Sequence, residues 1–149
     1  MALVIGTDSW ATVAEADTYL TNRIHADDWF ALNTSPAVPG ELAKESLLIS
    51  AFRWLLYHPQ LSLSAGSTDA NVLSAQIEGA LYLMNHYQEM DDRSAAIATG
   101  VTSFSLSKRT EDLDKRFLSI PNDIMGLLKS YMVTAGGAFA TLKGEYDVD

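Results

Sequence analysis

Hydrophobic residues recur through most of the chain at the three- and four-residue spacing of amphipathic helices. The first such stretch opens at Thr12, with Glu15 three residues later, which is the pattern of a capping box. It predicts a helix that ends near His25 or continues to Phe30, before a loop over residues 33–40 that contains two prolines. The apolar positions of its expected buried face are Val13, Ala16, Leu20 and Ile24.

A second helix is predicted from about Glu41 to Tyr57, where Pro59 stops it because proline cannot continue a helix. Residues 61–64 then alternate between apolar and polar, which allows a short extended piece. The helix has an apolar stripe that contains Leu42, Leu48, Phe52 and Leu55. Its charged residues are expected to point away from that stripe, and they are Lys44, Glu45 and Arg53.

A third helix, from about Ala70 to Met90, shows the clearest helical period in the chain. A turn over residues 66–69 precedes it and provides the cap at its start. Residues 91–93 are expected to end or interrupt it, and residues 94–99 to form a further turn. The apolar positions that trace its period are Leu73, Ile77, Ala80, Leu81, Met84 and Tyr87.

Strict alternation replaces the helical period between Ser103 and Ser107, with Phe104 and Leu106 as the apolar positions. This pattern is typical of a β-strand, and a strand needs a partner for its backbone donors and acceptors. Three partners remain open: the segment 61–64, a return strand near residue 110, or a neighbouring subunit.

A last helix is predicted to start at Ile120-Pro121, because proline suits the first position of a helix. Its expected buried face contains Ile124, Leu127, Leu128 and Tyr131. We therefore expect a mainly α fold, a small four-helix bundle with a short β-hairpin or extended loop, in residues 1–133. The glycine-rich and then acidic stretch 134–149 is expected to be a flexible tail.

Composition narrows the classes of function that this chain can have. Its 149 residues suit one domain, and the absence of cysteine excludes disulfides, thiolate metal sites and cysteine nucleophiles. Ten basic against nineteen acidic residues give a net charge of −9, which disfavours binding of nucleic acid through its phosphates. No apolar run reaches the ~18 residues of a membrane span and no signal peptide is evident, so we expect a cytoplasmic location.

No catalytic motif is present in the sequence, which lacks a nucleophile elbow, a phosphate-binding loop and a dinucleotide fingerprint. His25, Asp27 and Asp28 have a spacing that fits no metal site of fixed geometry. We expect no catalytic residue, no cofactor and no metal. The three tryptophans are expected to pack in the core, because stacking on bases requires a basic groove beside them: Trp10, Trp29 and Trp54.

One short segment departs from the acidic average. Four of the ten basic residues lie within nine positions, with three carboxylates among them: Lys108, Arg109, Lys115 and Arg116. The segment is either a solvated loop with internal ion pairs or a contact loop for an acidic neighbour such as another copy of the chain.

Five segments, taken in order, resemble one family. They are the opening 1–10, the stretch TVAEADTYL at 12–20, ESLLISAFRWL at 45–55, GVTSFSL at 100–106 and IPNDIMGLLKSY at 120–131. Together they resemble the head–tail connector proteins of tailed bacteriophages, also called adaptor or head-completion proteins. Some relatives are labelled DnaT-like single-stranded-DNA-binding proteins. The chain departs from the common pattern at 61–67, which is shortened and serine-rich.

The resemblance implies a structural virion protein that assembles in the host cytoplasm. Members form a ring, usually a dodecamer, beneath the phage portal protein. The ring extends the DNA channel, lets DNA pass without specific binding, and offers a platform to the next tail-side connector or tail-terminator protein. No catalytic residue, cofactor or membrane contact is implied.

The residues expected at subunit or portal interfaces are aromatic, aliphatic and basic: Phe104, Leu106, Lys108, Arg109, Lys115, Arg116, Phe139 and Tyr146. Two alternatives stay open. One is a DnaT-like single-stranded-DNA-binding module that uses the four basic residues of the 108–116 segment, and the other is an accessory or regulatory bundle of a cytoplasmic enzyme.

Overall fold

The computed structural model describes residues 2–98, 103–106, 109–112 and 119–133, with side chains in 2–87 and 119–133. The fold is mainly helical, as predicted. The elements follow in the order α1 (Val13–Leu20), α2 (Asp27–Ala31), α3 (Lys44–Leu56), α4 (Ala70–Ala98), β1 (Ser103–Leu106), β2 (Arg109–Asp112), α5 (Asn122–Leu127) and the 3-10 turn η1 (Lys129–Tyr131). The predicted tail, residues 134–149, lies outside the described residues.

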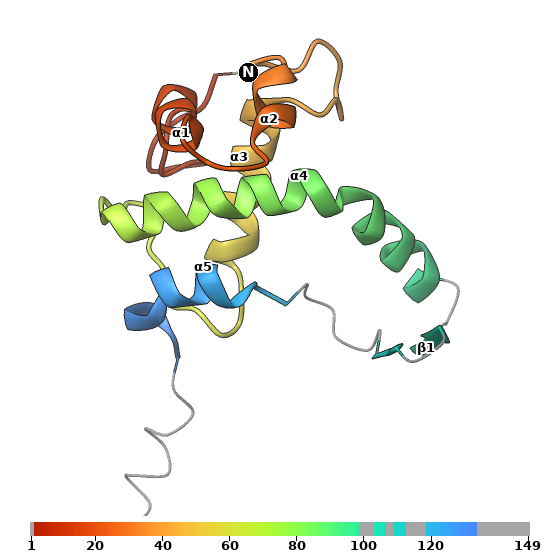
Figure 1. Cartoon of the computed structure of the whole chain (residues 1–149). Coiled ribbons are helices and arrows are strands. Elements are labelled where there is room, and N and C mark those ends of the chain that lie inside the picture. Colours follow the sequence, from red (N-terminus) through yellow and green to blue (C-terminus); the bar gives the residue numbers. More distant parts are fainter. Residues whose placement is uncertain (1, 99–102, 107–108, 113–118, 134–149) are drawn as a thin grey trace, which may run out of the picture.

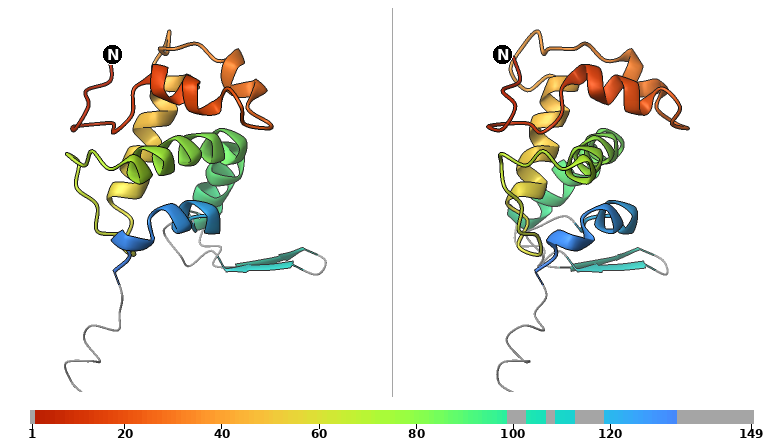
Figure 2. Two further views of the ribbon diagram at one scale, coloured as in Figure 1. Left: turned by 60° about the vertical axis from the view of Figure 1, so that its left-hand side comes forward. Right: turned by 90° about the vertical axis from the view of Figure 1, so that its left-hand side faces the viewer.

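Helix α4 separates two layers of the molecule (Figure 1). Helices α1 and α2 lie on one side of it and α5 lies on the other, while α3 crosses it and reaches both sides (Figure 2). Two hydrophobic clusters correspond to these layers. One surrounds Trp29 and Leu48 between α1, α2 and the α3–α4 pair, and the other surrounds Phe52 and Leu128 between that pair and α5.

The predicted first helix is divided into two. The capping box is confirmed, because the Glu15 N–H donates to Thr12 Oγ1 at 3.2 Å and the Thr12 N–H donates to Glu15 Oε2 at 2.8 Å. The helix then ends at Leu20, and His25 adopts a φ of 64°, which no right-handed helix can include. The expected burial of Ile24 is therefore wrong: its side chain is 80% exposed.

Helix α3 starts later than predicted, and the charged side chains of its first turn point inward where an outward position was expected. The helix begins at Lys44 and not at Glu41, whose carboxylate accepts hydrogen bonds from the Ala37 and Val38 backbone N–H groups in the preceding loop. Lys44 and Glu45 were expected to point outward, and both are buried.

An ion pair between the buried Lys44 and the partly exposed Asp17 explains the inward position of Lys44. Its Nζ donates to Asp17 Oδ1 at 2.9 Å, and the same oxygen accepts from Trp29 Nε1 at 2.8 Å. The ammonium group also lies 5.8 Å from the centre of the Trp29 ring, within range of a cation–π contact. One carboxylate from α1 thereby joins α2 and α3.

The side chain of Gln76 in α4 is fully buried and uses its whole hydrogen-bonding capacity. Its Oε1 accepts from the backbone N–H groups of Trp10 and Ala11, both at 2.9 Å. Its Nε2 donates to Ser9 Oγ and to the Leu48 carbonyl, both at 2.8 Å. This amide therefore connects α4 to α3 and to the segment that leads into α1.

Helix α4 is longer than predicted, because it continues through residues 91–93 and ends at Ala98. The sequence between Gly79 and Gly100 contains neither proline nor glycine. No residue of strongly unfavourable helix propensity therefore interrupts the second half of α4. The end of α4 and the hairpin that follows lie away from α1 and α2 (Figure 1).

The described C-terminal part is fixed to the body by hydrogen bonds to residues far away in the sequence. The predicted last helix divides into α5 and η1. The Ser62 N–H donates to the Tyr131 carbonyl at 2.8 Å, and the Val133 N–H donates to the Gln60 carbonyl at 2.9 Å. The Tyr131 hydroxyl also donates to Asp69 Oδ2 at 2.7 Å, and Asp69 Oδ1 accepts from a backbone N–H at the start of α4.

Replacing Gln76 with leucine is expected to lower the free energy of unfolding by about 3 kcal/mol or more, because four buried polar groups each lose a hydrogen bond. Urea unfolding followed by circular dichroism measures this. The matched control is Gln60→Leu at an exposed glutamine, which should change stability little. A loss below about 1 kcal/mol for Gln76→Leu would contradict the assigned role of the amide.

The Asp69–Tyr131 contact makes stability depend on pH at both extremes. The hydrogen bond from Tyr131 lowers the pKa of Asp69 from its ordinary 3.8, and the same bond raises the pKa of Tyr131 from 10.0. The Asp69 contribution is present above pH 3.8 and is lost as the pH falls through its lowered pKa. The Tyr131 contribution is present below pH 10.0 and is lost as the pH rises through its raised pKa.

We therefore expect Tyr131→Phe to destabilise the chain at neutral pH and to match the parent in strong acid and strong base. Thermal unfolding at each pH measures the difference between variant and parent. Tyr57→Phe is the control, since the Tyr57 side chain is 70% exposed. A destabilisation by Tyr131→Phe that is the same at every pH would show that the hydrogen bond is not its cause.

Candidate interaction surfaces

The strand predicted at Ser103 pairs within the chain. Strand β1 is antiparallel to β2, with Phe104 opposite Glu111 and Leu106 opposite Arg109. Of the three partners left open by the sequence, the return strand near residue 110 is confirmed. The alternative with residues 61–64 is wrong, because Leu61 forms its bridge with Met132.

The residues predicted at interfaces divide into two groups. Phe104, Leu106 and Arg109 lie in the hairpin, which the structure describes as backbone, at the far end of α4 (Figure 1). The others lie outside the described residues, and they are Lys108, Lys115, Arg116, Phe139 and Tyr146. Their roles stay predictions.

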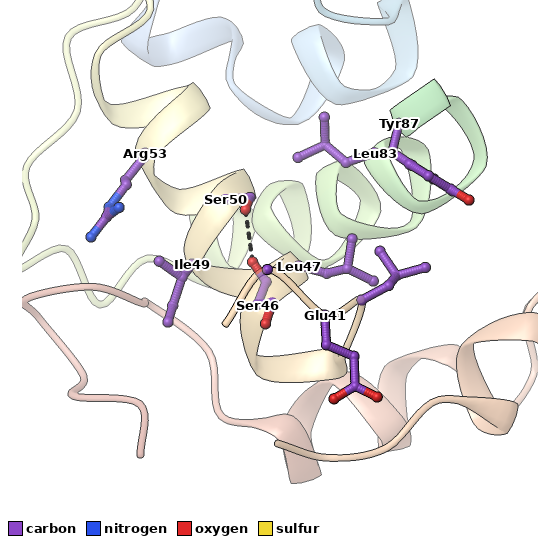
Figure 3. A pocket seen from close by; sticks show the side chains of 10 residues that line it. Glu41, Ser46, Leu47, Ile49, Ser50, Arg53, Leu83 and Tyr87 are labelled. Carbon is purple, nitrogen blue, oxygen red and sulfur yellow. Dashed lines mark hydrogen bonds between the residues drawn. The ribbon is translucent and has the colours of Figure 1, made fainter. Parts of the chain in front are cut away.

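A groove of about 550 Å³ lies between residues 40–42, α3 and α4 (Figure 3). Aliphatic and aromatic side chains form most of its wall, and a concave, mostly apolar surface of this size is typical of a binding site. The apolar lining residues are Leu42, Leu47, Ile49, Leu83 and Tyr87. No pattern in the sequence indicates this groove, because its wall depends on how the loop before α3 folds.

The polar groups of the groove differ in whether they already have partners. Ser50 Oγ donates to the Ser46 carbonyl at 2.8 Å, and Glu41 is occupied by the loop backbone. Arg53 is exposed, and no carboxylate of the described residues forms an ion pair with it. Its guanidinium extends away from the other labelled side chains (Figure 3). The groove therefore combines an apolar wall with one cation at its edge that has no ionic partner in the described part of the chain.

Arg23 shows the opposite arrangement on another surface. It forms an ion pair with Glu78 at 3.1 Å, and the Tyr19 hydroxyl donates to the other oxygen of Glu78 at 3.0 Å. Burial, followed by this hydrogen bond, raises the pKa of Tyr19 above its ordinary value. These contacts hold α1 against α4. Arg23 and Glu78 are therefore already paired with each other.

A second, polar cavity of about 470 Å³ brings Asn85 of α4 beside the three residues weighed above as metal ligands, which are His25, Asp27 and Asp28. All four side chains are exposed. Within the described part of the chain, no group of three or more His, Cys, Asp and Glu residues is placed to hold a metal ion.

The tryptophans lie mostly inside the protein, as predicted. Trp10 and Trp29 are buried, and Trp54 is half-buried. The ring of Trp54 stacks on Tyr82 at 5.8 Å between centroids, and Tyr82 stacks on His86 at 4.1 Å. These faces are covered by one another and do not form an open platform for bases.

Comparison of the chain with protein-family models, with curated proteins and with solved structures finds no match in any of the three. Among the helices in the described ranges, none combines the length and the apolar character needed to cross a bilayer.

The two cations of α3 are expected to respond differently to removal. Arg53→Ala should change the free energy of unfolding by less than about 0.5 kcal/mol, because it is an exposed residue with no ion pair in the described part of the chain. Lys44→Ala should cost more, about 1 kcal/mol or above, because it removes a buried side chain and the ion pair of the partly exposed Asp17. Chemical denaturation of the two variants side by side measures the contrast. Equal losses would show that Arg53 also supports the fold.

Proposed function

We propose that the chain is a head–tail connector of a tailed-bacteriophage virion. The observation that carries this proposal is the order of the five resembling segments, from the opening 1–10 to IPNDIMGLLKSY at 120–131. Each segment alone is a weak motif, and their shared order is more specific than any one of them.

The arrangement of the chain supports this proposal in one respect. A helical body carries the β1–β2 hairpin at the far end of α4, away from α1 and α2 (Figure 1). An element in that position is accessible to a neighbouring subunit, and sheet edges are frequent sites of pairing between chains. In the proposed ring, the hairpin contacts the next copy or the portal.

The proposed mechanism is assembly through complementary surfaces, with no covalent step. Twelve copies would form the ring beneath the portal, continue the DNA channel and present a platform to the tail-side connector. The net charge of −9 on each copy would repel the phosphates of the passing DNA, so that the channel does not retain it.

Electron microscopy of the full chain mixed with a purified portal ring tests this function. We expect an additional ring of density beneath the portal that is absent from portal alone. A portal of an unrelated phage serves as the specificity control. The absence of added density, together with no co-sedimentation, would contradict the proposal. Binding of the chain to single-stranded DNA that weakens steeply with salt would favour the DnaT-like alternative instead.

A further inference from the structure

We propose that the groove between residues 40–42, α3 and α4 is the binding site of the chain's own C-terminal segment, residues 134–149. The inference is independent of the proposed connector function. It follows from the chemistry of the groove, the composition of that segment and the place where the described chain meets it.

The groove requires an occupant with both apolar and anionic groups. Its wall exposes the ring of Tyr87 and part of Ile49, whose removal from water would be favourable, whereas Leu83 lines the groove but is itself buried. Its cation, Arg53, has no carboxylate partner among the described residues. A peptide that places an aromatic side chain on the wall and a carboxylate beside the guanidinium would satisfy both requirements.

The C-terminal segment has this combination of residues. Phe139 and Tyr146 provide aromatic rings, and Glu145 and Asp147 flank the second of them directly. With Asp149, the segment has three carboxylates against the single positive charge of its one lysine. Its charge is therefore complementary to that of Arg53.

The attachment point makes the groove of the same chain accessible. Val133 is hydrogen-bonded to Gln60, four residues beyond the end of α3, and Arg53 lies in the last turn of that helix. Residues 134–146 can extend over about 40 Å, which is ample for a return along α3. A short covalent tether gives an effective concentration in the millimolar range, so in dilute solution the chain's own segment outcompetes that of a second copy.

The full-length chain allows a direct test, because it contains no cysteine. A single Thr141→Cys substitution therefore takes one nitroxide label within the segment and no other. We expect the methyl NMR signals of Ile49 and Leu83 to lose intensity relative to the same sample after chemical reduction of the nitroxide. The methyl signals of Ile24, which does not line the groove, should keep their intensity.

Charge reversal separates recognition from chance proximity. Arg53→Glu in the labelled chain should restore the Ile49 and Leu83 signals, because it replaces attraction with repulsion. Lys129→Glu reverses an exposed cation outside the groove and should leave the loss of intensity unchanged. Circular dichroism should show that both variants melt at the temperature of the parent.

Two results would overturn the proposal. One is the absence of intensity loss at Ile49 and Leu83 in the labelled full-length chain. The other is a loss that is seen when a spin-labelled chain is mixed with a separate isotope-labelled chain and that disappears on dilution, which would assign the groove to a second copy. Neither result depends on whether a portal is bound, so the connector function is tested separately.

Discussion

The amide of Gln76 is the constraint on which the arrangement of the helices depends. A buried amide without partners is costly, and the fold avoids this cost by satisfying all four hydrogen bonds of the side chain. They fix the backbone of Trp10 and Ala11 against α4 and against the Leu48 carbonyl of α3. Helix α1 starts two residues after Ala11, and its position is therefore set by this contact. The indole of Trp10 then reaches the second hydrophobic cluster, where its ring centre lies 4.4 Å from that of Phe52.

A second polar contact follows from the first and shapes the candidate groove. Once α1 is in place, Asp17 meets Lys44 and Trp29, and this sets the first turn of α3. Because Lys44 points inward, residues 40–42 remain outside the helix and form one wall of the groove. The same turn buries Glu45, whose Oε2 has no hydrogen-bond partner within the described residues. Its position in the first turn of a helix offsets part of this cost, because the helix dipole favours a negative charge there.

Local signals in the sequence predicted the helices. The burial of charged residues and the shape of the groove depend on long-range contacts, which a local pattern does not contain. The Thr12 capping box and the leucine stripe of α3 involve neighbours within one or two turns, so a sequence pattern contains them. The inward position of Lys44 depends on a carboxylate 27 residues away, and a rule that places charges outside fails there. The predicted end of the first helix near His25 is wrong, because the helix already stops at Leu20, and a left-handed residue other than glycine, such as His25, leaves little trace in the sequence. The groove could not be predicted at all, because three separate segments form it.

The two proposals concern different parts of the chain, yet together they suggest how a chain that is closed in solution could join a ring. A segment that binds the groove of its own chain makes the same side-chain contacts when it binds the groove of a neighbour. The exchange therefore changes no interface, and its free energy depends on tether strain and on local concentration. In dilute solution the tether favours the closed chain. If the proposed portal held several copies side by side, neighbouring grooves would reach comparable effective concentrations, and linkage between subunits would then require no new binding surface.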